Sequence, residues 1–117
     1  MCSSDLIAGN NNAVMESQLN NGNKVMFVSV NGDNNGISAT QRGSGSHYLD
    51  ITLAGNGNSV NATQDGSANH KATIDLTNAG GPASLTLDQF SNATNLNYSI
   101  SQSCTTTTGC GAVITQR

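Results

Sequence analysis

The chain is poor in the residues that build large apolar cores and charged surfaces. Of its 117 residues, 35% are hydrophobic, 9% are charged and 3% are aromatic, with no tryptophan and one proline. Ordinary globular domains have about 45–50% apolar and about 25% charged residues. A large conventional core is therefore excluded. Asn, Gly, Ser and Thr take the space, so the chain is either disordered or a regular array in which polar groups satisfy one another.

Further absences argue against whole classes of function. The net charge is −3 and the isoelectric point is near 4.9, so the chain lacks the basic field that nucleic-acid binding requires, and we expect no nucleic-acid partner. No run of 18 apolar residues is present, so we expect no transmembrane segment. The few acids and the two histidines form no recognisable catalytic grouping, so we expect neither enzymatic activity nor a cofactor.

The first six residues, Met1 to Leu6, resemble the translation of a common short-read sequencing adapter whose GTG codon is taken as a start. We therefore expect residues 1–6 to be foreign to the protein and the domain to occupy residues 7–117. On this hypothesis, any export signal lies upstream of the printed chain.

The cysteines predict one disulfide. Cys104 and Cys110 flank a short run of threonines and a glycine, as if they closed one small loop, whereas Cys2 falls in the segment that we set aside. We expect Cys104 and Cys110 to be bonded and Cys2 to be disordered or unpaired. A disulfide favours an extracytoplasmic location.

A repeat of about 23 residues is the dominant feature of the sequence. Glutamines recur at spacings of 23, 23, 25 and 27 residues, namely Gln18, Gln41, Gln64, Gln89 and Gln116. An asparagine stands six residues before each of the first three, namely Asn12, Asn35 and Asn58. Halfway between the glutamines lie units that end in an aliphatic residue, at 24–30, 47–53 and 70–76. Glycines follow both kinds of unit, so each repeat is predicted to be strand, turn, strand, turn.

Alternation within each unit predicts which side chains face inward. In the glutamine units the inward sets are Val14, Glu16, Gln18; Ile37, Ala39, Gln41; and Val60, Ala62, Gln64. In the other units they are Met26, Val28, Val30; Leu49, Ile51, Leu53; and Ala72, Ile74, Leu76. Such a repeat predicts an all-β fold, a two-sided parallel β-solenoid of about 4.5 rungs, with equivalent strands stacked about 4.8 Å apart.

Stacking in register would place identical amides above one another. Each buried Asn or Gln would then bond to its own copy in the next rung, which satisfies a group that would otherwise be costly to bury. We expect the five repeating glutamines, the three asparagines and also Gln102 to take part in these ladders and in assembly. Glu16 has no acidic copy at Ala39, so we expect it at an exposed end.

The motif Asn-x-(Val/Ile)-x-Ala-x-Gln-x-Gly, present as Asn35 to Gly43 and Asn58 to Gly66, is similar to the curlin repeat. This is the repeat of the subunits of curli, the extracellular amyloid fibres of bacterial biofilms. The resemblance covers residues 12–116, and the closing Val113 to Arg117 looks like the C-terminus of the minor, nucleating subunit. It implies cell-surface polymerisation with copies of itself and with other curli-type subunits, cell adhesion, and no enzymatic activity.

One departure from the family pattern concerns the second strand of each repeat. Curlin repeats usually end both strands with Gln, whereas Val30, Leu53 and Leu76 stand here, so one of two amide ladders is absent.

Three other interpretations stay open. Outward threonines such as Thr40 and Thr63 resemble the ranks of ice-binding solenoids, and the chain could also be a soluble solenoid segment of an adhesin. His47 and His70 are 23 residues apart, with Lys24 in the same column, so a metal pair is conceivable, although polar corner residues are the simpler interpretation. We favour the fibre subunit, because the last unit repeats the inward pattern and its open edge can pair with another copy.

Overall fold

A computed structural model describes all 117 residues as ten strands joined by short turns, with no helix, and hence none that could span a membrane. The strands are β1 (Cys2–Ala8), β2 (Ala13–Gln18), β3 (Lys24–Asn31), β4 (Gly36–Gln41), β5 (His47–Ala54), β6 (Ser59–Asp65), β7 (His70–Asn78), β8 (Ala83–Phe90), β9 (Leu96–Cys104) and β10 (Cys110–Gln116). Their lengths of six to nine residues match the units that alternation predicts.

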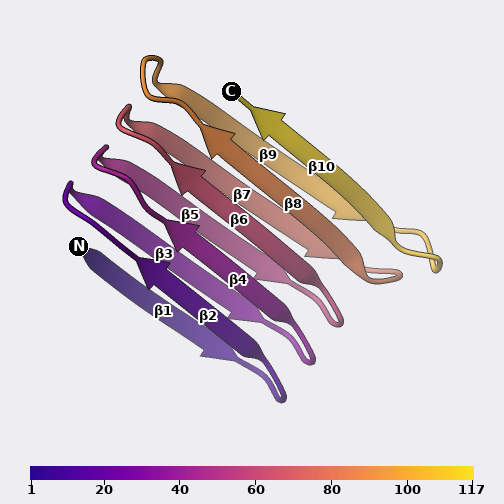
Figure 1. Cartoon of the computed structure of the whole chain (residues 1–117). Coiled ribbons are helices and arrows are strands. Elements are labelled where there is room, and N and C mark those ends of the chain that lie inside the picture. The colour runs from indigo at the N-terminus through magenta and orange to yellow at the C-terminus, as the bar shows by residue number, and fades with distance from the viewer.

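The strands form two parallel five-stranded sheets, and the chain passes from one to the other after every strand. Sheet A has the order β1-β3-β5-β7-β9 and sheet B the order β2-β4-β6-β8-β10 (Figure 1). One strand from each sheet makes a rung, so the molecule is a β-solenoid of five rungs. In the first four rungs the register follows the repeat, with Lys24 paired to His47 and His47 to His70. The predicted fold class is confirmed.

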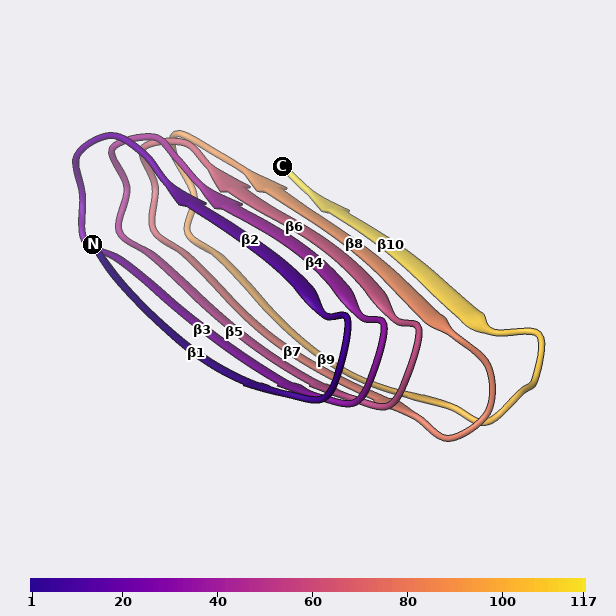
Figure 2. The same ribbon diagram turned by 90° about the horizontal axis from the view of Figure 1, so that it is seen from below.

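The two sheets face one another across a thin interior. Viewed along the stack, each rung is a flattened loop with its two strands on opposite sides (Figure 2). The predicted inward residues of the middle rungs are buried, with Leu49, Ile51, Ala62 and Ile74 fully inaccessible. Aliphatic side chains of sheet A therefore meet smaller aliphatic and amide side chains of sheet B, and this core needs no aromatic residue.

The first strand extends the solenoid beyond the predicted 4.5 rungs. Residues 2–8, most of which fall in the segment expected to be foreign, form β1 and pair in parallel register with β3 from Cys2–Val25 to Ala8–Asn31. All seven residues of β1 are exposed. Pairing of this kind uses backbone groups, which any segment without proline can supply to an open strand edge, so it is independent of the side chains. The structure thus has about five rungs.

Glycines are required where successive turns stack closely. Gly32 and Gly55 occupy equivalent turns and have φ values of 139° and 117°. A Cβ atom at Gly32 would overlap the carbonyl oxygen of Gly55 in the next rung. Only glycine combines that backbone conformation with that approach, which accounts for the recurrence of glycine after each strand.

Candidate assembly surface

The glutamines that close the strands of sheet B form one continuous hydrogen-bonded ladder. The amide Nε2 of each donates to the Oε1 of the glutamine in the following rung, over 2.9, 2.8, 2.8 and 2.7 Å. The ladder consists of Gln18, Gln41, Gln64, Gln89 and Gln116. The three middle side chains are completely buried. The structure therefore places all five repeating glutamines in one column.

A second hydrogen on Nε2 joins the two sheets. Gln41 donates to the carbonyl oxygen of Val25 and Gln64 to that of Tyr48, each over 3.0 Å. A buried amide left without partners would cost about 1–3 kcal/mol. Each of these glutamines instead ties a rung to the next rung and one sheet to the other, which explains why a polar residue is tolerated inside the solenoid.

The asparagines form a shorter ladder of opposite direction. Nδ2 of Asn35 donates to Oδ1 of Asn12 over 3.1 Å, and Nδ2 of Asn58 donates to Oδ1 of Asn35 over 3.0 Å. The column stops after Asn58, because Ala83 follows it in register and only its backbone N–H reaches the Oδ1 of Asn58. Asn78 supplies the missing amide from a neighbouring turn, over 3.0 Å.

Gln102 does not join either ladder, which corrects the expectation for that residue. It lies on β9 in sheet A and pairs in register with Leu76, so its column is the aliphatic one. Its Oε1 is buried and has no hydrogen-bond partner. Gln102 follows Gln89 by half a repeat, and half a repeat places a residue in the opposite sheet. The inward parity was right and the column was wrong.

Cys104 and Cys110 are joined by a disulfide, with Cα atoms 5.7 Å apart. Cys104 is fully buried beside the core, and the bridge closes the turn between β9 and β10. Cys2 is free and exposed on β1. The bond and the unpaired Cys2 agree with the prediction, and the bridge holds the last rung closed at one end of the solenoid.

A column of basic residues fills the opposite inner corner. Lys24 is 1% exposed, and its Nζ donates to the carbonyl oxygens of Asn21 and Gly43, over 2.8 and 2.7 Å. His47 and His70 continue the column in the next two rungs, and their Nε2 atoms lie within hydrogen-bond distance of backbone carbonyl oxygens. These side chains satisfy turn carbonyls, so each has a structural role in a corner.

The hydrogen bonds of His70 define a neutral ring. Its Nε2 lies 2.9 Å from the carbonyl oxygen of Asp65, which accepts, and its Nδ1 accepts from the backbone N–H of Leu96 over 3.3 Å. The Nδ1 of His47 is buried without a partner. Burial, followed by the charges of His70 and Lys24, lowers the pKa of His47. The histidine pair is therefore built for the uncharged state.

Both ends of the solenoid are open sheet edges. Strands β1 and β2 at one end, and β9 and β10 at the other, are each paired on one side only. Inward residues of the end rungs, such as Val14, Ile100 and Ile114, are half-buried, whereas Ile51 in the middle is fully buried. Each end therefore exposes part of the apolar core beside a row of unpaired backbone groups.

Glu16 is the acid at the first of these ends, as expected from its lack of an acidic copy. It pairs in register with Ala39, points inward, and contacts the hydroxyl of Ser3 through Oε2. Its Oε1 is buried and has no partner. Burial is the main cause that raises the pKa of Glu16, and the nearby carboxylate of Asp5 adds to it.

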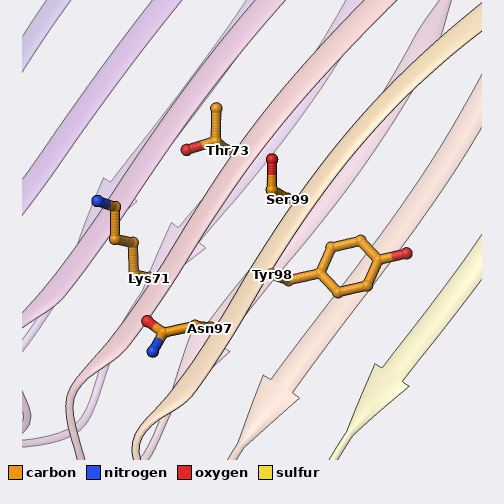
Figure 3. Close-up of a pocket in the computed structure, with 5 residues that line it drawn as sticks. All are labelled: Lys71, Thr73, Asn97, Tyr98 and Ser99. Carbon is orange, nitrogen blue, oxygen red and sulfur yellow. The ribbon is translucent and has the colours of Figure 1, made fainter.

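The outer faces carry mixed polar side chains. The close-up in Figure 3 shows a shallow groove on sheet A, where Lys71 and Thr73 of β7 lie beside Asn97 and Ser99 of β9, while Tyr98 points away from the other four. The outer rank of sheet B contains Ser17, Thr40, Thr63, Asp88 and Thr115 in register. A carboxylate interrupts that rank, so no face presents an unbroken array of threonines.

Sequence reasoning missed a second set of acceptors in the turns. Oδ1 of Asn56 accepts the backbone N–H of Asp33 over 2.7 Å, and Oδ1 of Asn69 accepts that of Ser46 over 2.8 Å. The 23-residue spacing from Asp33 to Asn56 was a usable signal. These contacts join the turns of adjacent rungs where the sheet ladders stop.

Searches against protein-family models, curated proteins and solved structures found no match to this chain.

Proposed function

We propose that this protein is a structural subunit of an extracellular curli-like amyloid fibre that polymerises by head-to-tail stacking of solenoid ends. The observation that carries the proposal is the pair of open ends, whose inward side chains continue the columns of the core. The curlin-like motifs at Asn35 to Gly43 and Asn58 to Gly66 support the family, the cell-surface location and a role in the biofilm matrix. The partners are further copies of the chain and other curli-type subunits.

Backbone pairing supplies much of the driving force. Strand β2 pairs with β4 over six residues, so an incoming strand of that length makes about six hydrogen bonds at roughly 1 kcal/mol each. Two strands are added per docking event, and the half-buried aliphatic residues of both ends leave water. Because the two ends are different surfaces, the contact does not close on itself and gives a filament.

The proposed role is structural and needs no cofactor. Amide ladders and aliphatic columns occupy the interior, whereas Asp50, Asp75 and Asp88 lie on outward strand positions in different rungs. Chemistry between them would need groups brought together in one cleft. The side chains instead serve stacking, which is the property that a fibre subunit requires.

The free edge of β10 offers a way to block assembly without unfolding the subunit. In parallel sheets, successive residues direct their backbone groups to alternate neighbours. The N–H of Cys110 donates to Pro82, the residue just before β8, so the N–H of Val113 points to the open side. Val113 is also 79% exposed, and Val113→Pro removes one docking donor while it keeps the pairing with β8.

The test is fibre formation by the purified chain, followed by thioflavin fluorescence and electron microscopy, with and without residues 1–6. We expect fibres from wild type and from the matched control Val113→Ala, and monomer from Val113→Pro. Persistent monomer for wild type at micromolar concentration would overturn the proposal. Monomer with thermal hysteresis on freezing would point to ice binding, and monomer without it to a soluble adhesin segment.

A further inference from the structure

The glutamine ladder has a direction, which makes the two ends complementary. Every Nε2 donates toward the C-terminal end, from Gln18 through to Gln116. At the first end, the Oε1 of Gln18 has no donor, and at the last end, the Nε2 of Gln116 has no acceptor. Two first ends brought together would oppose acceptor to acceptor, and two last ends would oppose donor to donor. Only unlike ends continue the ladder.

The register within the molecule defines the register between molecules. Gln89 pairs with Gln116 and Gln18 with Gln41, so a second copy that continues the stack sets its Gln18 on the Gln116 of the first. Ile114 pairs with Leu87, and Glu16 pairs with Ala39, in one column. The same continuation therefore sets Glu16 of the second copy on Ile114 of the first.

We propose, on the basis of the function proposed above, that β10 of one copy docks in parallel on β2 of the next with Gln116 against Gln18, and that burial of Glu16 against Ile114 makes this docking acid-dependent. The occupant of the open end is a second copy, since the free donor, the free acceptor and the aliphatic columns match. Docking of an ionised Glu16 would enclose its charge between apolar side chains, which is expensive. Protonation removes that cost.

No basic group is placed to compensate the carboxylate. Within the molecule, Glu16 faces Ser3 and Asp5 of β1 and Ala39 of β4, so the charged neighbour is another acid. Lys24 lies in the opposite corner, with its ammonium bound to turn carbonyls.

The docked copy brings no compensating charge either. Its inward side chains at this position are aliphatic, from Ile114 and Ile100, and Arg117 is bound to the outward Asp88 over 2.8 Å. The pKa of Glu16 is already raised in the single subunit, chiefly by burial, and further burial at an interface acts in the same direction.

The register is tested with pyrene labels. Ser17 and Thr115 lie on the outer face in one column, so Ser17→Cys and Thr115→Cys are combined in a Cys2→Ser background and labelled without reductant. Within one molecule the labels are four rungs apart, roughly 19 Å at about 4.8 Å per rung, whereas across the proposed interface they are one rung apart. We expect excimer emission in fibres of the double variant and none in its monomer.

The single variants are the matched controls. Labelled fibres that contain Ser17→Cys alone or Thr115→Cys alone should show monomer emission, since like ends do not meet. Excimer emission from either single variant, or its absence from fibres of the double variant, would overturn the register while the fibre function stood. Failure of the unlabelled wild type to form fibres would overturn both.

The acid dependence is tested by seeded elongation of the full chain between pH 5 and pH 7.5. We expect Glu16→Gln to elongate about tenfold faster than wild type at pH 7.5, and the ratio of the two rates to fall toward one at pH 5. The ratio cancels effects of pH on groups that both chains share. Asp75→Asn removes the same charge from an exposed outward position and should follow wild type at every pH. A constant ratio near one for Glu16→Gln would overturn the role of Glu16.

Discussion

The imidazole rings of His47 and His70 stack one rung apart, with centroids 4.9 Å apart and planes inclined by 9°. Both side chains are buried, and each Nε2 is held by a backbone carbonyl oxygen, from Arg42 and Asp65 respectively. Charging both rings would place two cations in contact next to the buried ammonium of Lys24. The histidine column therefore requires neutral rings.

We expect the soluble subunit to lose stability as pH falls from 7.5 to 5. Burial, with the charges of His70 and Lys24, lowers the pKa of His47 below its ordinary value of 6.5. The unfolded chain therefore binds more protons than the folded chain below that pH, and the free energy of unfolding decreases as pH falls. Urea unfolding followed by circular dichroism at several pH values measures this. The double variant His47→Gln/His70→Gln should lose most of the dependence, and equal stability of wild type at pH 5 and 7.5 would contradict the prediction.

Removal of a central glutamine should cost more than removal of a terminal one. Gln64→Ala leaves the Nε2 of Gln41 and the Oε1 of Gln89 without partners in a buried site. We expect a loss of about 2–4 kcal/mol from the free energy of unfolding, since each unsatisfied buried group costs about 1–3 kcal/mol. Gln18→Ala, at the half-buried first rung, should cost under about 1 kcal/mol. Equal losses for the two variants in urea titrations would refute the ladder as a source of stability.

The disulfide should stabilise the last rung. Its sequence separation is six, and closing so short a loop contributes about 2–3 kcal/mol. We expect Cys104→Ser/Cys110→Ser to lose about that amount while the first rungs keep their hydrogen-exchange protection. Intact mass after alkylation checks the pairing, because native protein should take one label at Cys2 and reduced protein three. Two or more labels without reduction would exclude the bridge.

Two glycine-to-alanine substitutions should act in opposite directions. At Gly32, with φ of 139°, a Cβ would overlap the carbonyl oxygen of Gly55, so Gly32→Ala should destabilise by more than about 1 kcal/mol. Gly36 lies in β4 with open space where its Cβ would stand. Gly36→Ala should therefore be neutral or stabilise by up to about 1 kcal/mol, because it restricts the unfolded chain. Thermal unfolding of the two variants beside wild type decides, and similar losses for both would contradict it.

Most of the fold could be predicted from the sequence because a solenoid is nearly one-dimensional. The 23-residue period places Gln18, Gln41 and Gln64 in one column, and alternation assigns their neighbours to the inside or the outside. Both properties are linear patterns, so counting finds them. The same counting located Cys104 and Cys110 at the two ends of one turn.

Counting was less successful where the repeat loses regularity. Gln102 has the inward parity of the ladder residues but belongs to the other sheet, where it meets Leu76. The composition of residues 2–8 gave no sign of a strand, and only an available edge on β3 brings β1 into the sheet. Such features depend on what lies beside a segment in space.

By itself, then, the sequence determines the parallel two-sided solenoid, its inward columns and its candidate disulfide, since each follows from period and parity alone. Tertiary structure decides which donor meets which acceptor. The opposite directions of the glutamine and asparagine ladders, the cross-sheet bond from Gln41 to Val25 and the stack of His47 on His70 all depend on side-chain orientation in closed turns. A hydrogen bond requires distance and angle in three dimensions, and a linear pattern contains neither.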